Sequence, residues 1–398
     1  MSSRVLVLGA GYAGLPAAKR IARQVFPGEV EVTLVNGTAD FVERPRLHQM
    51  AMGQDVKVVP LRSYLDGSGV RFVRGWVRSI DVDAHVVAVS EDGGLRHHSY
   101  DILVYALGSR TDVDTVPGVR EHALTLDTLD GAALASGALR GLEPGATVTV
   151  CGGGLTGIEI ATEVAESLPG LDVRLVSGTE PGHWLSGKAR RHLQHVLDDL
   201  HVDVADGARV REVRSGELVL EQGRRVPFDV GFWAGGFGVP ALARASGLAV
   251  TAQGRARVDS RMQSVSHPDV YVIGDAAAVA GSWGEEFAMG CRTGGFTGPK
   301  VADVVAARLT GRETGPLRFR YIHECISLGR RHGVVQFLDA DGAPKPRILT
   351  GRKAITYKNA VLNGARLVFG HAGPALARRR HLVDAGTAAT PAAARQSA

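Results

Sequence analysis

The sequence predicts an α/β protein with two Rossmann-like dinucleotide-binding units, the second inserted in the first, and a small C-terminal segment. Short apolar runs alternate with helix-like segments along the chain, as expected for parallel sheets covered on both faces. A G-x-G-x-x-G turn follows such a run twice, at Gly9-Ala10-Gly11-Tyr12-Ala13-Gly14 and at Gly152-Gly153-Gly154-Leu155-Thr156-Gly157. A later apolar run, Val270–Ile273, precedes Gly274-Asp275 and returns the chain to the first unit.

The first unit begins with a strand over Arg4–Leu8, followed by the first glycine turn and a helix to about Gln24. The turn residues Asp92-Gly93-Gly94 mark the end of a predicted strand pair. The further strands expected in this unit are Glu29–Val35, Gly69–Ile80, His85–Ser90 and Tyr100–Ala106.

The second unit repeats this plan, with Gly152 placed 143 residues after Gly9. Its expected elements are strand Thr147–Cys151, a helix from about Leu155 to Ser167, strand Asp172–Val176, a long amphipathic stretch to about Leu200 and strand Val230–Ala234. We therefore predict one dinucleotide domain from residues 1–117 and 236–310, and an inserted domain from residues 118–235. Residues 311–386 form a C-terminal segment, and residues 387–398, which lack periodicity, are predicted to be a disordered tail.

The composition fits a globular chain of two or three domains that binds ligands. Glycine makes up 51 of 398 residues, about 13%, against roughly 7% in average proteins. This excess suits a backbone that turns tightly and approaches ligands closely. The net charge of +5 is scattered, with one short cluster at Arg378-Arg379-Arg380, so no nucleic-acid partner is expected. The charge is mildly favourable for anionic cofactors or an anionic membrane surface, but solvated surface arginines are the favoured explanation.

The cysteines and histidines point to no metal site. Cys151, Cys291 and Cys325 form no C-x-x-C pair, which excludes a cysteine zinc site and a disulfide scaffold and fits a reducing cytoplasm. His192 and His195 lack a third convergent ligand, so a charged helix surface is expected there. The sequence has no apolar run of about 18 residues that could span a bilayer. The apolar N-terminus is interpreted as a strand and not as a signal peptide.

Each glycine turn has the form that binds a dinucleotide pyrophosphate, because its glycines let the backbone approach the anion and the following helix offers free N–H groups. The second strand of such a unit usually ends in an acidic residue that holds the adenosine ribose. Asn36 has this position in the first unit and can still bond a ribose hydroxyl. Ser177 has it in the second unit, where no acid repels a 2′-phosphate and no arginine follows immediately to bind one. NADH and NADPH both stay open, with NADH favoured.

Four segments in this order carry a resemblance to a known family. They are Gly9–Gly14, Leu103–Ser109, Gly152–Glu159 and Tyr271–Asp275. Over roughly residues 4–310 the chain resembles the two-dinucleotide flavoprotein reductases of the pyridine nucleotide–disulfide oxidoreductase superfamily. Within them it is most similar to the branch with type II NADH dehydrogenases and flavoproteins related to apoptosis-inducing factor. The resemblance implies that the first unit binds FAD and that the second binds NAD(P)H.

The resemblance also implies cofactor-binding positions. Those assigned to FAD are Gly9, Gly11, Tyr12, Ala13, Gly14, Asn36, Val77, Ala106, Gly108, Gly274 and Asp275, and those assigned to NAD(P)H are Gly152, Gly154, Leu155, Thr156, Gly157, Ser177 and Gly235. The Asp275 carboxylate is expected to accept a hydrogen bond from a ribityl hydroxyl, with a helix N-cap as the alternative. Val77 has the position of a backbone contact to adenine, or is an apolar residue of an edge strand.

Glu159 is the candidate catalytic residue. By similarity it lies beside the nicotinamide, where it orients the ring or relays a proton; alternatively, its carboxylate stabilises the helix dipole. The segment Phe41–His48 has no cysteine where the disulfide reductases of this superfamily carry a redox pair. Electrons are therefore expected to leave the flavin directly. Arg46 and His48 are interpreted as contacts to the FAD phosphates or the flavin edge, or else as surface charge.

The C-terminal part is expected to complete the acceptor site. Ser327–Gly329 are predicted to face the flavin, and the segment leading into Pro299–Thr310 is predicted to aim a helix N-terminus at its pyrimidine ring. Cys291 and Cys325 raise a sulfide–quinone reductase as an alternative, but their spacing does not match that pattern. Ile355–Arg380 mixes apolar and basic residues, as membrane-bound amphipathic helices do. However, four residues are expected to interrupt any helix there: Gly364, Gly370, Gly373 and Pro374.

We therefore predict an FAD-dependent NAD(P)H oxidoreductase that passes electrons to a quinone, without a redox disulfide. The alternatives are a soluble reductase for an electron-transfer protein or a specialised metabolite, and an NAD(P)H-sensing flavoprotein. The expected location is the cytoplasm. Peripheral contact with the inner face of the plasma membrane and a homodimer are left open.

Overall fold

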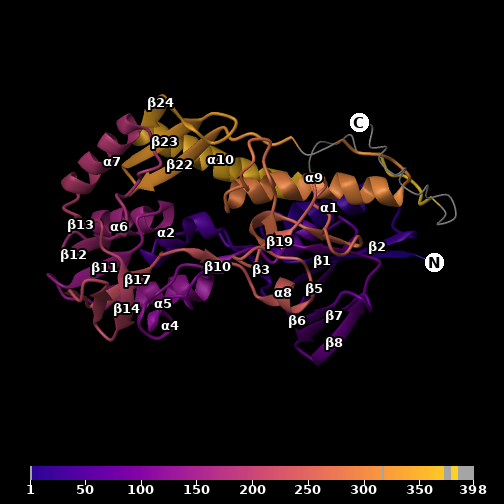
Figure 1. Cartoon of the computed structure of the whole chain (residues 1–398), viewed down its shortest axis with the longest axis horizontal. Helices are drawn as coiled ribbons and strands as arrows, with labels where there is room; N and C mark the ends of the chain where they lie inside the picture. Colours follow the sequence, from indigo (N-terminus) through magenta and orange to yellow (C-terminus); the bar gives the residue numbers. More distant parts are fainter. Residues whose placement is uncertain (1, 316–317, 372–377, 384–398) are drawn as a thin grey trace, which may run out of the picture.

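The computed structural model describes residues 2–315, 318–371 and 378–383. Two parallel sheets lie toward opposite ends of an elongated molecule, and the C-terminal strands and helix lie over one side of it (Figure 1). The predicted disordered tail, residues 387–398, falls outside the described part of the chain.

The first sheet has the strand order β20-β9-β1-β2-β5, and all neighbouring strands in it are parallel. Its strands are β1 (Ser3–Leu8), β2 (Val30–Asn36), β5 (Val70–Arg74), β9 (Ile102–Tyr105) and β20 (Val270–Val272). Residues Val5–Leu8 are all buried, as expected for a strand covered on both faces. β20 follows the second unit in sequence but pairs with β9, so the chain returns to the first sheet as predicted.

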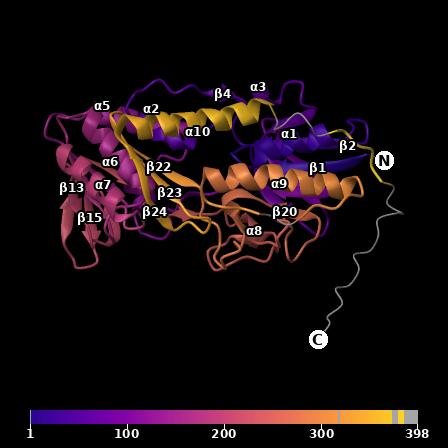
Figure 2. The same cartoon turned by 90° about the horizontal axis from the view of Figure 1, so that it is seen from above.

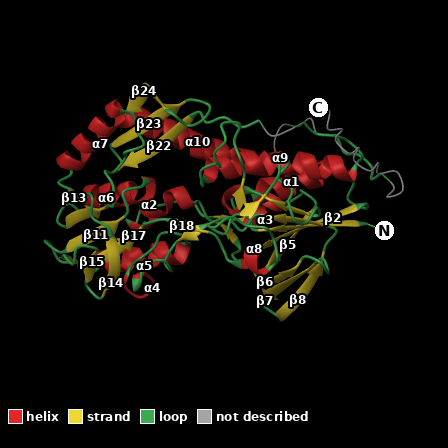
Figure 3. Ribbon diagram, viewed as in Figure 1, coloured by secondary structure: helices red, strands yellow, loops and turns green. Residues whose placement is uncertain are grey.

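Helices α1 (Gly14–Gln24) and α9 (Cys291–Leu309) cover one face of the first sheet (Figures 1 and 3). An antiparallel sheet of β6 (Trp76–Asp81), β7 (Val86–Glu91) and β8 (Gly94–Ser99) lies against the other face. A Cβ atom at Gly298 would lie 2.3 Å from the Ala13 carbonyl oxygen, so α9 needs glycine where it crosses the start of α1. An ion pair of 2.7 Å between Arg20 Nε and Asp303 Oδ1 joins the same two helices.

The strand predicted over Gly69–Ile80 is two strands in the structure. β5 pairs with β2 in the first sheet, whereas β6 pairs with β7 in the antiparallel sheet, and Gly75 separates them. A Cβ atom at Gly75 would lie 2.5 Å from a Val89 methyl carbon, so the chain passes from one sheet to the other at a point that only glycine fits. The prediction was wrong here because the apolar pattern continues across the change of sheet.

The second sheet has the strand order β13-β12-β11-β17 and is also parallel throughout. Its strands are β11 (Thr147–Cys151), β12 (Asp172–Val176), β13 (Asp203–Ala205) and β17 (Val230–Trp233). It is accompanied by α4 (Val119–His122), α5 (Leu129–Arg140), α6 (Leu155–Ser167), α7 (Gly187–Asp199), β14 (Val210–Arg214), β15 (Glu217–Leu220) and β16 (Arg225–Pro227). Strands β11, β12 and β13 therefore repeat the arrangement of β1, β2 and β5. This doubling confirms the predicted pair of Rossmann-like units.

The chain crosses between the two units twice, at one place. β10 (Arg110–Thr111) leads into the second unit, and β18 (Phe237–Gly238) leads back. The two strands pair with each other in antiparallel fashion, Arg110 opposite Gly238 and Thr111 opposite Phe237. A single short two-stranded connection therefore carries both crossings.

The C-terminal part consists of an antiparallel sheet and one long helix. The sheet contains β22 (His323–Leu328), β23 (His332–Leu338) and β24 (Pro344–Thr350), and α10 (Gly351–His371) follows it. Figure 2 shows α10 running from the side of the second unit toward the first. Gly364 and Gly370 were expected to interrupt this helix, which is wrong: α10 continues through both. Buried contacts of Ala354, Lys358 and Leu362 outweigh the roughly 1 kcal/mol that an internal glycine costs.

The remaining elements are short. They are β3 (Asp40–Phe41), η1 (Arg44–Arg46), α2 (Leu47–Ala51), β4 (Val59–Pro60), α3 (Leu61–Leu65), α8 (Leu242–Ala245), β19 (Ala256–Arg257), η2 (Gly274–Ala276) and β21 (Ala277–Ala278). Within residues 2–315, 318–371 and 378–383, no helix combines the length and the apolarity that crossing a membrane requires.

Candidate functional site

The two glycine turns have the same backbone construction. Each opens with a glycine in the left-handed region, at φ +94° for Gly9 and +124° for Gly152. A Cβ atom at Gly14 would lie 1.9 Å from the Gly9 carbonyl oxygen, and one at Gly157 would lie 1.8 Å from that of Gly152. Glycine is thus required at both ends of each turn, where strand, turn and helix pack together.

The middle glycine of each turn faces open space. A Cβ atom at Gly11 or at Gly154 would meet no atom within 4 Å. The backbone there can be approached by a ligand, and the N-termini of α1 and α6 follow directly. Open backbone ahead of a helix N-terminus is the arrangement that receives a pyrophosphate, so both turns fit a dinucleotide.

One cavity of about 390 Å³ is bordered by both turns. The sequence-predicted residues that line it are Gly11, Tyr12, Ala13, His48, Ala106, Gly108, Leu155, Thr156, Glu159, Gly274 and Asp275. Lys358, Val361 and Leu362 of α10 also line the cavity. So do Gly290, Cys291 and Arg292 at the start of α9. Two segments 143 residues apart in sequence therefore meet at the same space.

Other predicted residues do not line this cavity. Ten of them lie outside its lining: Gly9, Gly14, Asn36, Arg46, Val77, Gly152, Gly154, Gly157, Ser177 and Gly235. Asn36 Oδ1 accepts a 2.9 Å hydrogen bond from Ala10 N, and its amide nitrogen donates to the carbonyl and hydroxyl oxygens of Thr38 at 3.0 Å. The Asn36 amide therefore ties the first glycine turn to the end of β2. Its contact to a ribose stays a prediction.

Arg46 turns toward Glu43, with Nε 3.4 Å from Oε2. Arg44 lines the cavity instead, where it donates to the Ser109 carbonyl oxygen at 2.7 Å and to Asp127 Oδ1 at 3.0 Å. A sequence rich in arginine gives no local signal that distinguishes these two. The phosphate contact of Arg46 stays a prediction.

Asp275 lies in the η2 turn and faces the cavity. Its Oδ2 accepts a 2.6 Å hydrogen bond from the Ser109 hydroxyl, and its Oδ1 accepts one of 2.7 Å from Gly290 N, just before α9. The alanines that follow form β21 and not a helix, so the alternative of an N-cap for a following helix was wrong. Asp275 instead holds the start of α9 at the cavity wall. That helix begins at Cys291, earlier than the Pro299–Thr310 segment expected from the sequence.

A buried ion pair forms the cavity wall on the side of α6. Glu159 Oε1 contacts Lys358 Nζ and accepts a 2.8 Å hydrogen bond from Ser327 N, and Lys358 donates to the Ser327 hydroxyl at 2.8 Å. Both charged side chains are at most 9% exposed. Glu159 lies beyond the first turn of α6 and is paired with a cation, so the helix-dipole alternative loses its support. Ser327 lies behind the pair and not in the cavity lining.

His48 connects this pair to a second buried carboxylate. Its Nδ1 lies 3.9 Å from Glu159 Oε2, and its Nε2 lies 3.7 Å from Glu163 Oε2. Burial, with the nearby cations Lys358 and Arg330, holds the pKa of His48 well below its usual range. Burial raises the pKa of Glu163 even though Arg330 Nη2 lies 2.7 Å away. A neutral imidazole therefore lies between two carboxylates, each of which has its own cation.

Both Cys291 and Cys325 line the cavity. Burial raises the pKa of the Cys325 thiol to about 12, so it stays protonated at neutral pH and is a weak nucleophile. That the two cysteines face one cavity could not be predicted from their spacing, because one begins α9 and the other lies in β22.

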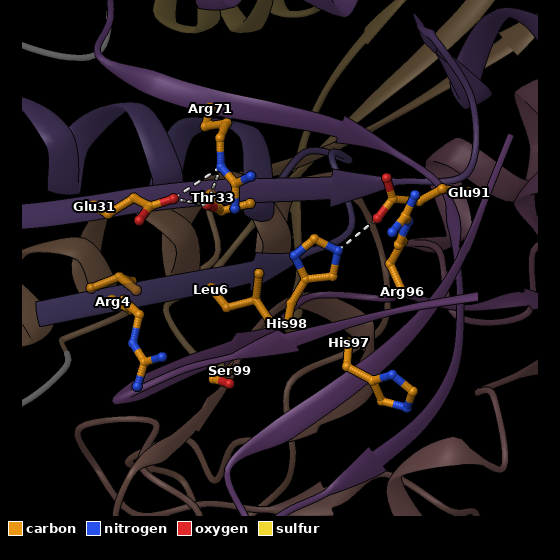
Figure 4. Close-up of a pocket in the computed structure, with 11 residues that line it drawn as sticks. Arg4, Leu6, Glu31, Thr33, Arg71, Glu91, Arg96, His97, His98 and Ser99 are labelled. Atoms are coloured by element: carbon orange, nitrogen blue, oxygen red, sulfur yellow. Dashed lines mark hydrogen bonds and ion pairs between the residues drawn. The ribbon is translucent and has the colours of Figure 1, made fainter. Parts of the chain in front are cut away.

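A second, polar crevice of about 420 Å³ lies between the first sheet and β8 (Figure 4). Two pairs of its charged side chains contact each other: Arg71 Nε lies 2.9 Å from Glu31 Oε1, and His98 Nε2 lies 2.7 Å from Glu91 Oε1. Its lining, drawn in Figure 4, includes none of the predicted site residues. The cavity between the two turns is therefore the candidate site.

Comparison with known proteins shows the family of this chain and finds relatives and solved structures that are similar to it. A family model described as pyridine nucleotide-disulphide oxidoreductase matches residues 3–306. The chain is 29% identical to an NADH dehydrogenase-like protein of Mycobacterium tuberculosis, over 92% of this chain and 96% of that one. It is 25% identical to a type II NADH:quinone oxidoreductase of Staphylococcus haemolyticus, over 95% of this chain and 98% of that one. Among solved structures, NDH2 from Plasmodium falciparum in complex with NADH has a TM-score of 0.79 at 13% identity, covering 94% of this chain and 97% of that one.

Proposed function

Because the chain belongs to the pyridine nucleotide-disulphide oxidoreductase family, an oxidoreductase family with FAD and NAD(P)H as cofactors, we propose that it transfers electrons from NAD(P)H through FAD to a quinone. The observation that carries the proposal is the single cavity bordered by both glycine turns. Two dinucleotides bound at these turns would bring their reactive rings into one space, which hydride transfer requires.

We assign each glycine turn to a nucleotide from the segment that lies beside it. Gly274-Asp275 lies on the side of the first turn, so we assign that turn, and residues 1–117 and 236–310, to FAD. Residues 118–235, with the second turn, are left for the nicotinamide nucleotide. Gly11, Tyr12 and Ala13 would hold FAD, and Leu155 and Thr156 would face the nicotinamide.

Bound at the first turn, FAD would supply the two-electron redox chemistry that links the nicotinamide to the acceptor. The chain supplies the electrostatic setting. The N-terminus of α9, held by Asp275, directs its partial positive charge at the cavity, where it favours negative charge on a reduced ring. Glu159 and Lys358 line the same cavity.

Reduction of a quinone also consumes protons, and the buried pair can deliver them. Lys358 lines the cavity, and its Nζ donates a hydrogen bond to Glu159 Oε1, so N–H protons lie at the cavity wall. His48, whose pKa is held low by its burial, lies between Glu159 and Glu163 and separates the two carboxylates. Glu159 thus acts in this proposal as a proton carrier beside the nicotinamide.

A quinone is the acceptor that suits the rest of the lining. Apolar side chains from several elements face the cavity: Val42, Leu126, Phe237, Met289, Val361 and Leu362. Val361 and Leu367 on α10 are also 39% and 64% exposed, which supports peripheral contact with a membrane that holds the quinone. The type II NADH:quinone oxidoreductase among the relatives is named for the same acceptor.

A second candidate is a flavoenzyme that acts on sulfur compounds, because Cys291 and Cys325 face the same cavity. The raised pKa of Cys325 disfavours its thiolate and so weakens this candidate. The double variant Cys291→Ser with Cys325→Ser separates the two. Direct transfer to quinone predicts a turnover within about twofold of wild type, whereas a thiol relay predicts its loss.

The test of the main proposal uses the purified holoprotein. It should be yellow, its flavin absorbance should bleach on anaerobic addition of NADPH or NADH, and adding a soluble quinone should restore the colour. A colourless protein without FAD, or flavin that neither nucleotide reduces, would overturn the proposal. Bleaching that only a protein or a specialised metabolite reverses would favour the soluble reductase, and very slow reoxidation by every acceptor would favour the sensing flavoprotein.

A further inference from the structure

We propose that the nicotinamide nucleotide of this protein is NADPH, and that Arg209 binds its 2′-phosphate beside Ser177. The inference rests on the proposed function, which assigns the second glycine turn to the nicotinamide nucleotide. It decides between two nucleotides that the sequence left open, and it reverses the preference for NADH. Arg209 follows Ser177 by 32 residues, so the sequence next to Ser177 does not reveal it.

Ser177 ends β12 directly against the second glycine turn. It is 4% exposed, and a Cβ atom at Gly153 would lie 2.2 Å from its hydroxyl oxygen. An acidic side chain at this place would accept from the ribose hydroxyls of NADH and repel a 2′-phosphate. The hydroxyl of Ser177 is neutral, so the ribose pocket of the second unit carries no repulsive charge from the end of its strand.

Arg209 reaches the same place from the loop that follows the neighbouring strand, β13. β13 ends at Ala205, and a 2.8 Å hydrogen bond from Ala208 N to the Ser177 carbonyl oxygen ties the following loop to β12. A Cβ atom at Gly178 would lie 3.2 Å from Arg209 Cγ and 3.9 Å from its Nε. The Arg209 side chain therefore crosses the backbone immediately after Ser177.

The surroundings leave the Arg209 cation available to an anion. Arg209 is exposed, and within the described part of the chain it takes part in none of the ion pairs. The acid that follows Gly178 most closely is Glu180, and its Oε2 lies 2.8 Å from Arg190 Nη1. Arg209 is thus a cation without a bound carboxylate at the edge of a nucleotide site, where a planar guanidinium suits a phosphate.

The first unit has a different side chain at the equivalent position. β5 lies beside β2 as β13 lies beside β12, and Trp76 follows β5 closely. Indole carbons of Trp76 would lie 2.7 Å from a Cβ atom at Gly37, the residue after Asn36. Each unit therefore covers the glycine after its second strand with a side chain from the segment that follows the neighbouring strand, β5 in the first unit and β13 in the second. That side chain is aromatic in the first unit and cationic in the second, as two different nucleotides would require.

The first test is a binding measurement on the holoprotein that involves no electron transfer. Adenosine 2′,5′-bisphosphate and adenosine 5′-monophosphate are titrated in a calorimeter against wild type, Arg209→Ala and Arg209→Lys. We expect the bisphosphate to bind wild type roughly tenfold or more tightly than the monophosphate, as a charge-assisted contact to phosphate implies. Arg209→Ala should bring the ratio close to one, and Arg209→Lys should keep part of it. Equal binding of both probes by wild type would overturn the inference, as would an equal loss of both in Arg209→Ala.

The second test compares flavin reduction by NADPH and by NADH. Wild type should show the lower KM for NADPH, and Arg209→Glu should reverse the order. Arg140→Ala, an exposed arginine at the end of α5 in the same unit, serves as the control and should leave both constants unchanged. Reduction by neither nucleotide would defeat the proposed function, whereas efficient reduction by NADH with no advantage for NADPH would defeat only this inference.

Discussion

The two glycine turns follow the same backbone path but end beside different side chains. In the first unit the Asn36 amide bonds to Ala10 and Thr38, and the Trp76 indole covers Gly37. In the second unit Ser177 leaves a neutral pocket, and the Arg209 side chain covers Gly178. The glycines thus determine where a pyrophosphate can lie, and the strand ends determine which nucleotide is bound. Duplicating the backbone does not duplicate the specificity.

The helices that follow the turns differ in the same way. Two residues after the last glycine of the turn, α1 carries Pro16 and α6 carries Glu159. The two buried carboxylates at the candidate site, Glu159 and Glu163, therefore both lie on the helix of the second unit. We infer that the first turn mainly holds its nucleotide, whereas the helix of the second also contributes reactive groups.

The largest expected effect comes from substitutions that disrupt one glycine turn at a time. In Gly14→Ala or Gly157→Ala the new methyl would lie within 2 Å of a backbone oxygen, so the turn must open. We expect Gly14→Ala to lose most of its FAD. Gly157→Ala should stay yellow but no longer bleach with either nicotinamide nucleotide. Flavin absorbance per protein and anaerobic bleaching measure both. A Gly14→Ala protein with full flavin content would contradict the assignment of the turns.

The next largest effect is expected at the buried Glu159–Lys358 pair. Lys358→Met leaves the Glu159 carboxylate buried without its cation, which costs about 3–5 kcal/mol of unfolding free energy. Denaturant unfolding should show this loss, and quinone reduction should slow. Adding Glu159→Gln to Lys358→Met removes the unpaired charge and should recover part of the stability but not the turnover. If the single variant were as stable as wild type, the pair would not be a buried one.

A smaller effect is expected from the aromatic cover of the first unit. Trp76 is 60% exposed, so its truncation disturbs little of the core. If its indole stacks on the FAD adenine, Trp76→Ala should weaken FAD binding by about 1–3 kcal/mol, as base stacking on aromatic side chains does. The KM for NADPH should not change, in contrast to Arg209→Ala. Fluorescence titration of the apoprotein with FAD measures the first effect, and unaltered FAD affinity would remove Trp76 from the site.

The smallest expected effect is a pH dependence of stability. The pKa of His48 is lowered in the folded protein, so the unfolded state takes up a proton near the ordinary pKa of 6.5 while the folded state does not. The stability that His48 contributes is therefore present above that pH and is lost as the pH falls below it, by up to about 1.4 kcal/mol per pH unit. Glu163, with its raised pKa, acts in the opposite sense, since the folded state binds its proton more readily.

The measurement is the difference in unfolding free energy between wild type and His48→Gln from neutral pH down to about 5.5. The advantage of wild type should shrink as the pH falls. A difference that stays constant over this range would mean that His48 titrates normally.

The sequence was sufficient for the parts that depend on local chemistry. Strand, glycine turn and helix are neighbours in the chain, so β11, α6 and β12 have the predicted bounds. Arg209 and Lys358 were missed because each meets its partner only through the fold, Lys358 at a separation of 199 residues from Glu159. The break at Gly75 and the unbroken α10 were predicted wrongly because tertiary packing, and not local propensity, decides both.

Helix α10 has a mechanical consequence for how nucleotides come and go. It begins beside β22 and β23 on the second unit, and at its far end Phe369 packs against Tyr12 and Phe41 of the first, with ring centroids 5.4 and 5.1 Å apart. The β10–β18 connection alone would be a natural hinge, but α10 contacts both units and would restrict movement about it. We therefore expect the two units to keep a constant separation through the catalytic cycle. The nicotinamide nucleotide would then enter and leave without an opening movement of one unit away from the other.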